Sequence, residues 1–286
     1  MLVIAGLAFV FLCVLGGYAA LGGHVAVLWQ PFEFVIIGGA ALGAFIMANP
    51  VPVLKKSGKA VVNLLKGSKY NKKAYIELLS LQYMIFKLAK SKGNLALETH
   101  VENPEDSPLF QQFPVFFANK KAVTFLCDYL RLITLGTENA HEFENLVEQE
   151  LDVVEEENEH IAHALQTMAD ALPALGIVAA VLGVIKTMGS ITEPPEVLGK
   201  LIGGALVGTF AGVFMSYGMV GPIAAAVRAA NEGESRYFAC MKAGMMAFLQ
   251  GYAPAIAIEF ARKSLYSNDR PTFYEVEEAT QALPAA

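Results

Sequence analysis

The sequence predicts an all-α polytopic membrane protein with four transmembrane helices and a large helical cytoplasmic domain. The chain has 286 residues, of which 55% are hydrophobic. Its mean hydropathy of +0.44 is too high for an ordinary soluble protein. The segment 201–227 contains no Asp, Glu, Lys, Arg or His. At about 1.5 Å per helical residue, this segment is longer than the ~30 Å of bilayer hydrocarbon. We therefore expect it to span the membrane, to tilt in it or to project beyond it.

Four apolar segments are expected to cross the membrane. No Asp, Glu, Lys or Arg precedes Glu33, but Gly22, Gly23 and Pro31 interrupt this stretch and divide it between two helices. Since a second span follows the first at once, we interpret the N-terminal segment as a retained anchor and not as a signal peptide. The four expected spans are 2–21, 32–48, 171–191 and 201–227.

The distribution of basic residues predicts the orientation. Of the 21 Lys and Arg, 13 lie within 51–166 and six lie from Arg228 onward, whereas the connection 22–31 has none. Basic residues favour the cytoplasmic side, so both polar regions and both termini are expected there. The predicted organisation is a transmembrane hairpin (1–49), a cytoplasmic helical domain (50–169), a transmembrane pair (170–227) and a cytoplasmic helical tail (228–286).

The first polar region begins with basic helices. Seven lysines lie within 55–73 and alternate with apolar residues such as Val61 and Leu64. This pattern predicts an amphipathic helix that lies near anionic lipid. A second helical pattern runs over 74–91, and Lys92-Gly93-Asn94 is typical of a helix end.

Three further segments of the polar regions have helical patterns. Residues 118–135 are apolar-periodic, and residues 138–159 carry many acidic side chains but no Lys or Arg. The acidic segment is expected to be an amphipathic helix that leads into the membrane. The apolar tail segment 245–258 is too short for a fifth span, so we expect a helix docked in the cytoplasm.

The two long apolar segments carry special residues. Gly204, Gly208 and Gly212 recur every four residues, so one face of the helix allows another helix to approach closely. That contact is either a generic helix–helix interface or a specific site of assembly. Pro173 and Pro222 each remove a backbone donor. Pro173 lies near the start of its expected span, where it is either a start signal or an internal break. Pro222 is either a kink or a hinge.

The side chains needed for enzymatic or metal chemistry are missing. No nucleophile elbow, phosphate loop, dinucleotide fingerprint or zinc signature is present, so we expect no enzyme and no cofactor. His160 and His163 share a helix face but lack a third ligand. The acidic residues nearest the spans, Glu33 and Asp170, are expected at opposite membrane ends. A titrating group inside the membrane must therefore come from another polypeptide. The cysteines at 13, 127 and 240 suggest no disulfide, and the charge of −6 argues against nucleic acid.

Several motifs resemble the MotA family of flagellar motor stator subunits, within the MotA/ExbB/TolQ proton channel superfamily. The resemblance covers essentially the whole chain. It is carried by LPALGIVAAVLGVIKTMGSI at 172–191, IGGALVGTFAGVFMSYGMVGPIA at 202–224, ENP at 102–104, DYLRL at 128–132, and the tail motifs GYAPAIAIEFARKSLYS and RPTFYEVEE.

The resemblance implies a ring of five copies around the single helices of a MotB dimer in the bacterial inner membrane. MotB would supply the ion-binding aspartate, and the ring would act on the rotor protein FliG. Pro173, Tyr217 and Pro222 would lie on the ion path. Lys90 and Glu98 match the family's rotor-facing charges, and Lys87 and Lys92 are expected to share this role. The family often has Arg at the position of Lys90, and Lys keeps the charge but not the bidentate pairing.

The residues at two positions on the ion path predict the coupling ion. Sodium-driven relatives present threonine at both positions, whereas this chain has Thr209 at one and Ala180 at the other. A hard cation needs several oxygen ligands, and a methyl group supplies none. We therefore expect coupling to protons.

Two other classes of membrane protein remain as alternatives. An ExbB/TolQ-type energiser also surrounds a partner's helices, but such relatives typically have three spans and lack the large insertion within 51–170. A ligand-gated channel or passive scaffold would need neither a partner aspartate nor a rotor-facing charge cluster.

Overall fold

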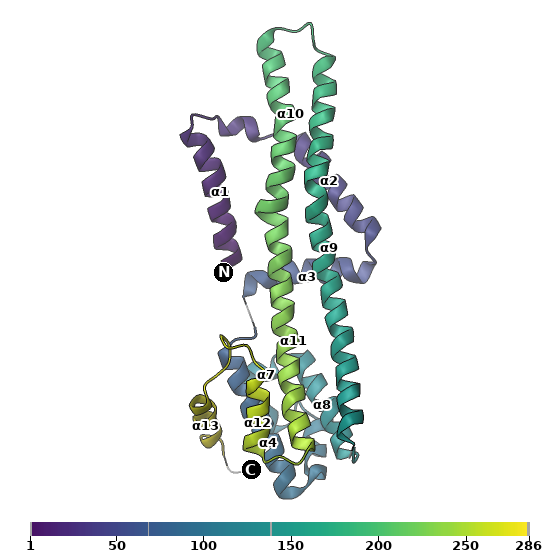
Figure 1. The fold of residues 1–286 in the computed structure, drawn as a ribbon, viewed down its shortest axis with the longest axis vertical. Helices are drawn as coiled ribbons and strands as arrows, with labels where there is room; N and C mark the ends of the chain where they lie inside the picture. The colour runs from purple at the N-terminus through teal and green to yellow at the C-terminus, as the bar shows by residue number, and fades with distance from the viewer. Residues whose placement is uncertain (1, 68, 138, 285–286) are drawn as a thin grey trace. The chain divides into compact units, whose positions relative to one another are not determined.

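The computed structural model describes residues 2–67, 69–137 and 139–284. All regular secondary structure in these residues is helical. Four of its helical segments are long and apolar enough to cross a membrane. The predicted fold class is therefore confirmed. Glu138, the first residue of the predicted acidic helix, lies outside the described residues, as do residues 1, 68, 285 and 286. The elements are α1 (Leu2–Ala20), η1 (Val25–Leu28), α2 (Pro31–Ala48), α3 (Val51–Lys66), α4 (Lys72–Lys92), η2 (Asn94–Leu97), α5 (Glu98–Glu102), α6 (Pro108–Gln111), α7 (Pro114–Phe117), α8 (Lys120–Thr134), α9 (Ala140–Met188), α10 (Pro195–Met215), η3 (Ser216–Val220), α11 (Gly221–Leu249), α12 (Pro254–Lys263) and α13 (Phe273–Gln281) (Figure 1).

The chain divides into two compact units with three boundaries between them, of which one follows α3 and two fall inside the long helices α9 and α11. Unit 1 comprises residues 1–67 and 157–230, and unit 2 comprises residues 68–156 and 231–286. Unit 1 therefore contains the first two apolar helices, α3, the C-terminal part of α9, and α10 with the start of α11. Unit 2 contains the remaining, mostly polar, helices.

Helix α9 is much longer than the predicted third span. It begins at Ala140 and includes both the acidic segment and the apolar segment without interruption. Its sequence contains no Gly or Pro before Pro173, so nothing breaks the helix earlier. Pro173 lies inside the helix, where its missing amide removes the hydrogen bond to the carbonyl of Ala169 without ending the helix. The interpretation of Pro173 as a start signal is therefore wrong.

The predicted fourth span is also longer than expected. Helix α10 continues through one π-helical turn, η3, into α11, which ends at Leu249. In this turn the amide of Gly221 donates to the carbonyl of Ser216, five residues earlier. Pro222 follows at once, and in a regular α-helical turn its ring would crowd the carbonyl of Gly218, four residues earlier. The wider turn thus accommodates Pro222 within a continuous helix. Within unit 1, the α9–α10 connection extends beyond the ends of α1 and α2 (Figure 1).

Unit 2 is built around α4. This helix is buried on most of its surface and contacts α7, α12, α13 and η2. Phe86 stacks on Phe248 of α11 at 4.6 Å, and the buried amide of Gln82 donates to the carbonyl of Met241. Gly93, with φ +86, ends α4 where the sequence predicted a helix end. The helical pattern predicted over 74–91 thus belongs to a helix that is enclosed on several sides.

The predicted tail helix 245–258 is wrong. Helix α11 ends at Leu249, and α12 begins at Pro254. Gly251 adopts a φ of +87 between them, a conformation that favours glycine, and Pro254 occupies the first turn of α12. A turn therefore divides the apolar segment into the end of one helix and the start of the next.

Unit 1 depends on a close backbone contact between α9 and α10. A Cβ atom on Gly212 would lie 2.6 Å from the carbonyl oxygen of Leu172 and 2.7 Å from the Cα of Gly176. A Cβ on Gly176 would in turn lie 2.9 Å from the carbonyl oxygen of Gly208. These neighbours are backbone atoms, so a side chain fits only if one helix moves. The predicted small-residue face thus packs against the chain's own α9.

We predict that Gly212→Ala destabilises the protein, whereas Gly203→Ala on the same helix does not. Overpacking against backbone costs about 1–3 kcal/mol, but a Cβ at Gly203 meets no atom within 4 Å. The measurement is the thermal unfolding midpoint of the detergent-solubilised full chain. Equal midpoints for the two variants would contradict the packing described for α9 and α10.

Candidate functional site

The predicted ion-path residues of α10, η3 and α11 lie along one open face. Thr209, Tyr217 and Pro222 are all exposed, and the side chain of Val213, between the first two, is 42% exposed. Residues four apart share a face of an α-helix, which aligns 209, 213 and 217. A π-turn has its hydrogen bond between residues five apart, so Pro222 stays in line with Tyr217. The turn therefore keeps these residues in one row.

Ala180 lies on α9 at the level of Thr209. A Cβ on Gly208 would lie 3.0 Å from the backbone nitrogen of Ala180, and Thr209 is the next residue along the chain. Ala180 is half-buried and offers only a methyl group, whereas Thr209 offers a hydroxyl. The structure thus brings the two predicted ion-selectivity positions to the same height on adjacent helices.

The glycine row faces away from this open surface. Gly208 and Gly212 are buried against α9, and Gly204 lies near the side chain of Gln30, just before α2. The sequence left open whether this face makes a generic helix–helix contact or forms a specific site of assembly. In the structure, the chain's own α9 and the segment just before α2 contact it.

Glu33 is placed at this same junction. It lies in the first turn of α2, and its Oε2 would be 3.0 Å from a Cβ on Gly208. This oxygen is buried and has no hydrogen-bond partner among the described residues. From its place in the sequence, Glu33 was expected only to lie at one end of the membrane. The glycine row was the available signal, since a missing side chain at Gly208 leaves room for the carboxylate.

Pro173 and Asp170 lie further along α9. Pro173 is half-buried and belongs to the turn that follows Asp170. Asp170 is exposed, and its Oδ1 accepts a hydrogen bond from the Gln166 amide at 2.8 Å. Ten residues of helix, or about 15 Å, separate Asp170 from Ala180. At the level of Ala180 and Thr209, the residues described above for the open face offer a hydroxyl and apolar groups. None of these residues carries a carboxylate.

The predicted rotor-facing charges lie in unit 2, where α4 ends and α5 begins. Lys87, Lys90, Lys92 and Glu98 are exposed, and none of them forms an ion pair with another described residue. Unpaired exposed charges keep their field for an external partner. These four charges can therefore act electrostatically on an external partner.

Two residues beside these charges were not predicted. Leu95, on η2 between α4 and α5, is 72% exposed. His100 bonds the hydroxyl of Ser107 at 2.8 Å. Burial, assisted by the charge of Lys92, holds the pKa of His100 below its usual range. His100 is therefore neutral at neutral pH and adds no charge to the cluster. Neither residue follows a pattern that sequence reasoning could have detected.

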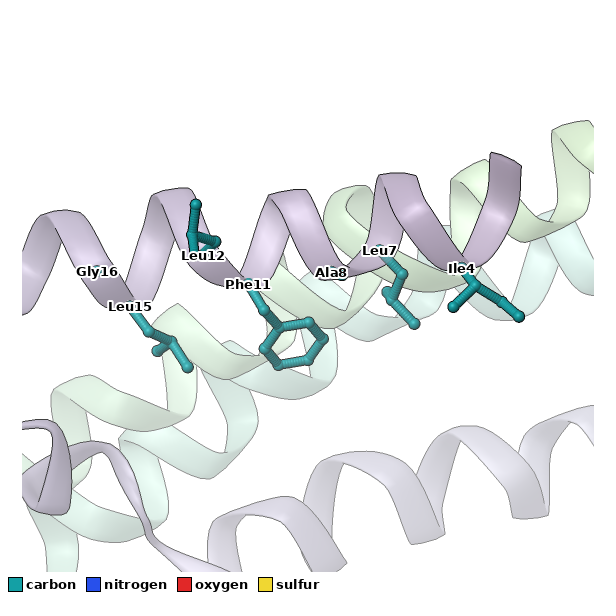
Figure 2. A pocket seen from close by; sticks show the side chains of 7 residues that line it. All are labelled: Ile4, Leu7, Ala8, Phe11, Leu12, Leu15 and Gly16. Atoms are coloured by element: carbon teal, nitrogen blue, oxygen red, sulfur yellow. The ribbon is translucent and has the colours of Figure 1, made fainter. Parts of the chain in front are cut away.

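The remaining candidates offer no site chemistry. Within the described ranges no group of three His, Cys, Asp or Glu could hold a metal ion, and His160 and His163 are both exposed. A shallow hollow on α1 is lined by apolar residues only. Figure 2 shows these side chains along a single helix: Ile4, Leu7, Ala8, Phe11, Leu12, Leu15 and Gly16. Such a surface is suited to contact with lipid chains or apolar side chains.

Two protein families match the sequence. Residues 4–93 match "Motility protein A N-terminal", and residues 119–239 match the "MotA/TolQ/ExbB proton channel family". The chain is 42% identical over 283 residues to motility protein A of Salmonella typhimurium, covering 99% of this chain and 96% of that protein. It is 36% identical to chemotaxis protein LafT of Vibrio parahaemolyticus, covering 96% of each.

Two solved structures share the fold. The C. jejuni MotAB structure superposes with a TM-score of 0.79 at 20% identity, covering 94% of this chain and 98% of that chain. The flagellar MotAB stator complex of Bacillus subtilis superposes with a TM-score of 0.75 at 24% identity, covering 93% and 96%. At these identities the likeness concerns the fold.

Proposed function

Because this chain belongs to the motility protein A family of the MotA/TolQ/ExbB proton channel proteins, we propose that it is the stator subunit that converts ion flow into flagellar torque. The observation that carries this proposal is the open row of Thr209, Val213, Tyr217 and Pro222. The row is exposed in the single chain, and the apolar segment 201–227 supplies no titratable carboxylate or imidazole. A second polypeptide must therefore complete the path.

The partner is a MotB-type protein whose single helices pack on the open row. The two solved structures described above are MotAB complexes, which supports the pairing. MotB supplies the aspartate that takes up the ion, because a relay through lipid needs an intramembrane ionisable group. Five copies of this chain surround the MotB dimer. Pro173 and Pro222 lie at backbone positions with a missing donor, where small changes of helix geometry are least costly.

The coupling ion is the proton. Ala180 and Thr209 lie at the same level, but only Thr209 offers an oxygen from its side chain. A desolvated sodium ion requires several oxygen ligands, whereas a proton needs only the partner's carboxylate and water. One elementary charge crossing ~100 mV releases about 2.3 kcal/mol. That energy is sufficient for modest rearrangements in each step.

The exposed charges of unit 2 contact the rotor protein FliG. Lys87, Lys90, Lys92 and Glu98 are free of ion pairs within the described chain, and Leu95 adds an apolar surface beside them. This surface must lie in the cytoplasm to reach a rotor. That position agrees with the Lys and Arg distribution, which places both termini of this inner-membrane protein in the cytoplasm.

The second candidate function is an energiser of the ExbB/TolQ type. The match at residues 119–239 is named for both groups. The match at residues 4–93 is specific to motility protein A, and it includes the first two candidate spans and α3. This N-terminal match favours the stator.

We predict that this chain, together with a MotB-type partner, restores swimming to a strain that lacks its own stator. Swimming speed should not change when sodium is removed at fixed pH, because the Ala180 methyl cannot bind a metal cation. The measurement is swimming speed against sodium concentration. Swimming that stops without sodium would overturn proton coupling but keep the stator assignment. No motility with any competent partner would favour the ExbB/TolQ-type alternative.

We also predict that the double variant Lys90→Glu with Glu98→Lys reduces swimming speed but leaves membrane assembly intact. Both side chains are exposed and unpaired, so reversal alters the external field and not the packing. Lys73→Glu, at the other end of α4, is the matched control because Lys73 is also exposed. The measurements are swimming speed and recovery of the complex with its partner. Loss of the complex in the double variant would indicate a structural role instead.

A further inference from the structure

Helix α3 lies across the long helices of unit 1 and has two different exposed flanks. Figure 1 shows α3 running crosswise to α9 and to the start of α11. One face, with Ala60, Val61 and Leu64, packs against a buried cluster that includes Ile161 and Val227. A helix that is fixed sideways against spanning helices is in the position of an interfacial helix.

The exposed surface of α3 separates into charged and apolar strips. At 3.6 residues per turn, Lys55, Lys59 and Lys66 form a strip opposite the packed face. Val62 and Leu65 lie along one edge of this strip, and their side chains are 54% and 51% exposed. The apolar edge and the lysine strip are thus adjacent, as on helices that rest at a bilayer surface.

The opposite edge of the strip points to the aqueous side. Lys56 lies there and pairs with Glu157 of α9. Glu157 precedes Ile161 on α9 and so lies further from the apolar end of that helix. The pair therefore marks the edge of α3 that faces away from the membrane, and the edge with Val62 and Leu65 faces toward it.

The three lysines of the strip, Lys55, Lys59 and Lys66, have no ion-pair partner among the residues that the structure describes, and all three are exposed. Lysines at the edge of a bilayer extend their ammonium groups to the level of the lipid phosphates. An anionic headgroup adds a net negative charge that a zwitterionic headgroup lacks.

We propose that the outer face of α3 is a docking surface for anionic phospholipid of the inner leaflet. The headgroups bind Lys55, Lys59 and Lys66, and Val62 and Leu65 enter the boundary with the acyl chains. The surface thereby selects the lipids around this subunit and holds α3 against the membrane. This inference depends on the multi-pass membrane location of the chain and does not depend on the coupling ion or on torque.

The test places a reporter on α3. The chain contains one Trp, Trp29, so the full-length double variant Trp29→Phe with Val62→Trp has a single emitter. It is reconstituted in phosphatidylcholine vesicles that contain an equal mole fraction of brominated phosphatidylglycerol or brominated phosphatidylcholine. Bromine quenches only nearby Trp. We expect quenching by the phosphatidylglycerol to be at least about twofold stronger at low salt, with the excess lost in concentrated KCl.

Matched lysine variants assign the effect to α3. The triple variant Lys55→Gln, Lys59→Gln and Lys66→Gln should lose the excess quenching, whereas Lys87→Gln, Lys90→Gln and Lys92→Gln should keep it. Equal quenching by the two lipids would overturn the anionic preference. No quenching by either lipid would show that protein, such as a second copy, covers this face. Loss of the excess quenching in both triple variants would show that the total charge of the protein, and not the three lysines of α3, causes it. None of these outcomes bears on swimming, so the stator assignment is tested separately.

Discussion

The close contact between α9 and α10 is the constraint on which the rest of unit 1 depends. At Gly176 and Gly212 the two helices meet backbone to backbone, with no space for a Cβ on either side. Such contacts are favourable in lipid because short distances allow dispersion and weak hydrogen bonding without a hydrophobic driving force. The contact fixes the rotation of α10 about its axis. It thereby buries the glycine row and turns Thr209, Val213 and Tyr217 outward.

In the proposed function, the outward row and the π-turn together explain how an apolar subunit takes part in moving an ion. The row offers one hydroxyl and one phenol but no acid, so it can line a path but cannot relay a proton by itself. The π-turn keeps Pro222 on the same row and leaves the helix continuous. We propose that a subunit of this kind shapes the surroundings of a partner's carboxylate. Membership of a proton channel family agrees with a subunit that lines the path while a partner supplies the titrating group.

Much of this architecture could be predicted from the sequence, because charge-free segments and basic loops report directly on the membrane. The helix end at Gly93 was also predictable, because glycine tolerates the positive φ that often ends a helix. The sequence could not show that α9 joins the acidic and apolar segments, because a single proline is a weak signal inside so long a helix. It also left two interpretations of the glycine row open. Spacing reveals a face that admits close approach, but it does not say whether the neighbour belongs to the same chain. The unpartnered oxygen of Glu33 depends on that same packing and was beyond sequence reasoning.

The central claim is that the open row, and not the glycine row, meets the partner's helix. The most direct test is disulfide cross-linking in the complex with a MotB-type partner, with Cys13→Ser to remove the exposed native thiol. Val213→Cys is combined with a cysteine scan along the partner's spanning helix. Val207→Cys on the same helix is the control, because Val207 is only 4% exposed. Our account predicts cross-links from Val213→Cys at helical intervals and none from Val207→Cys. Cross-links from position 207 with none from position 213 would contradict it.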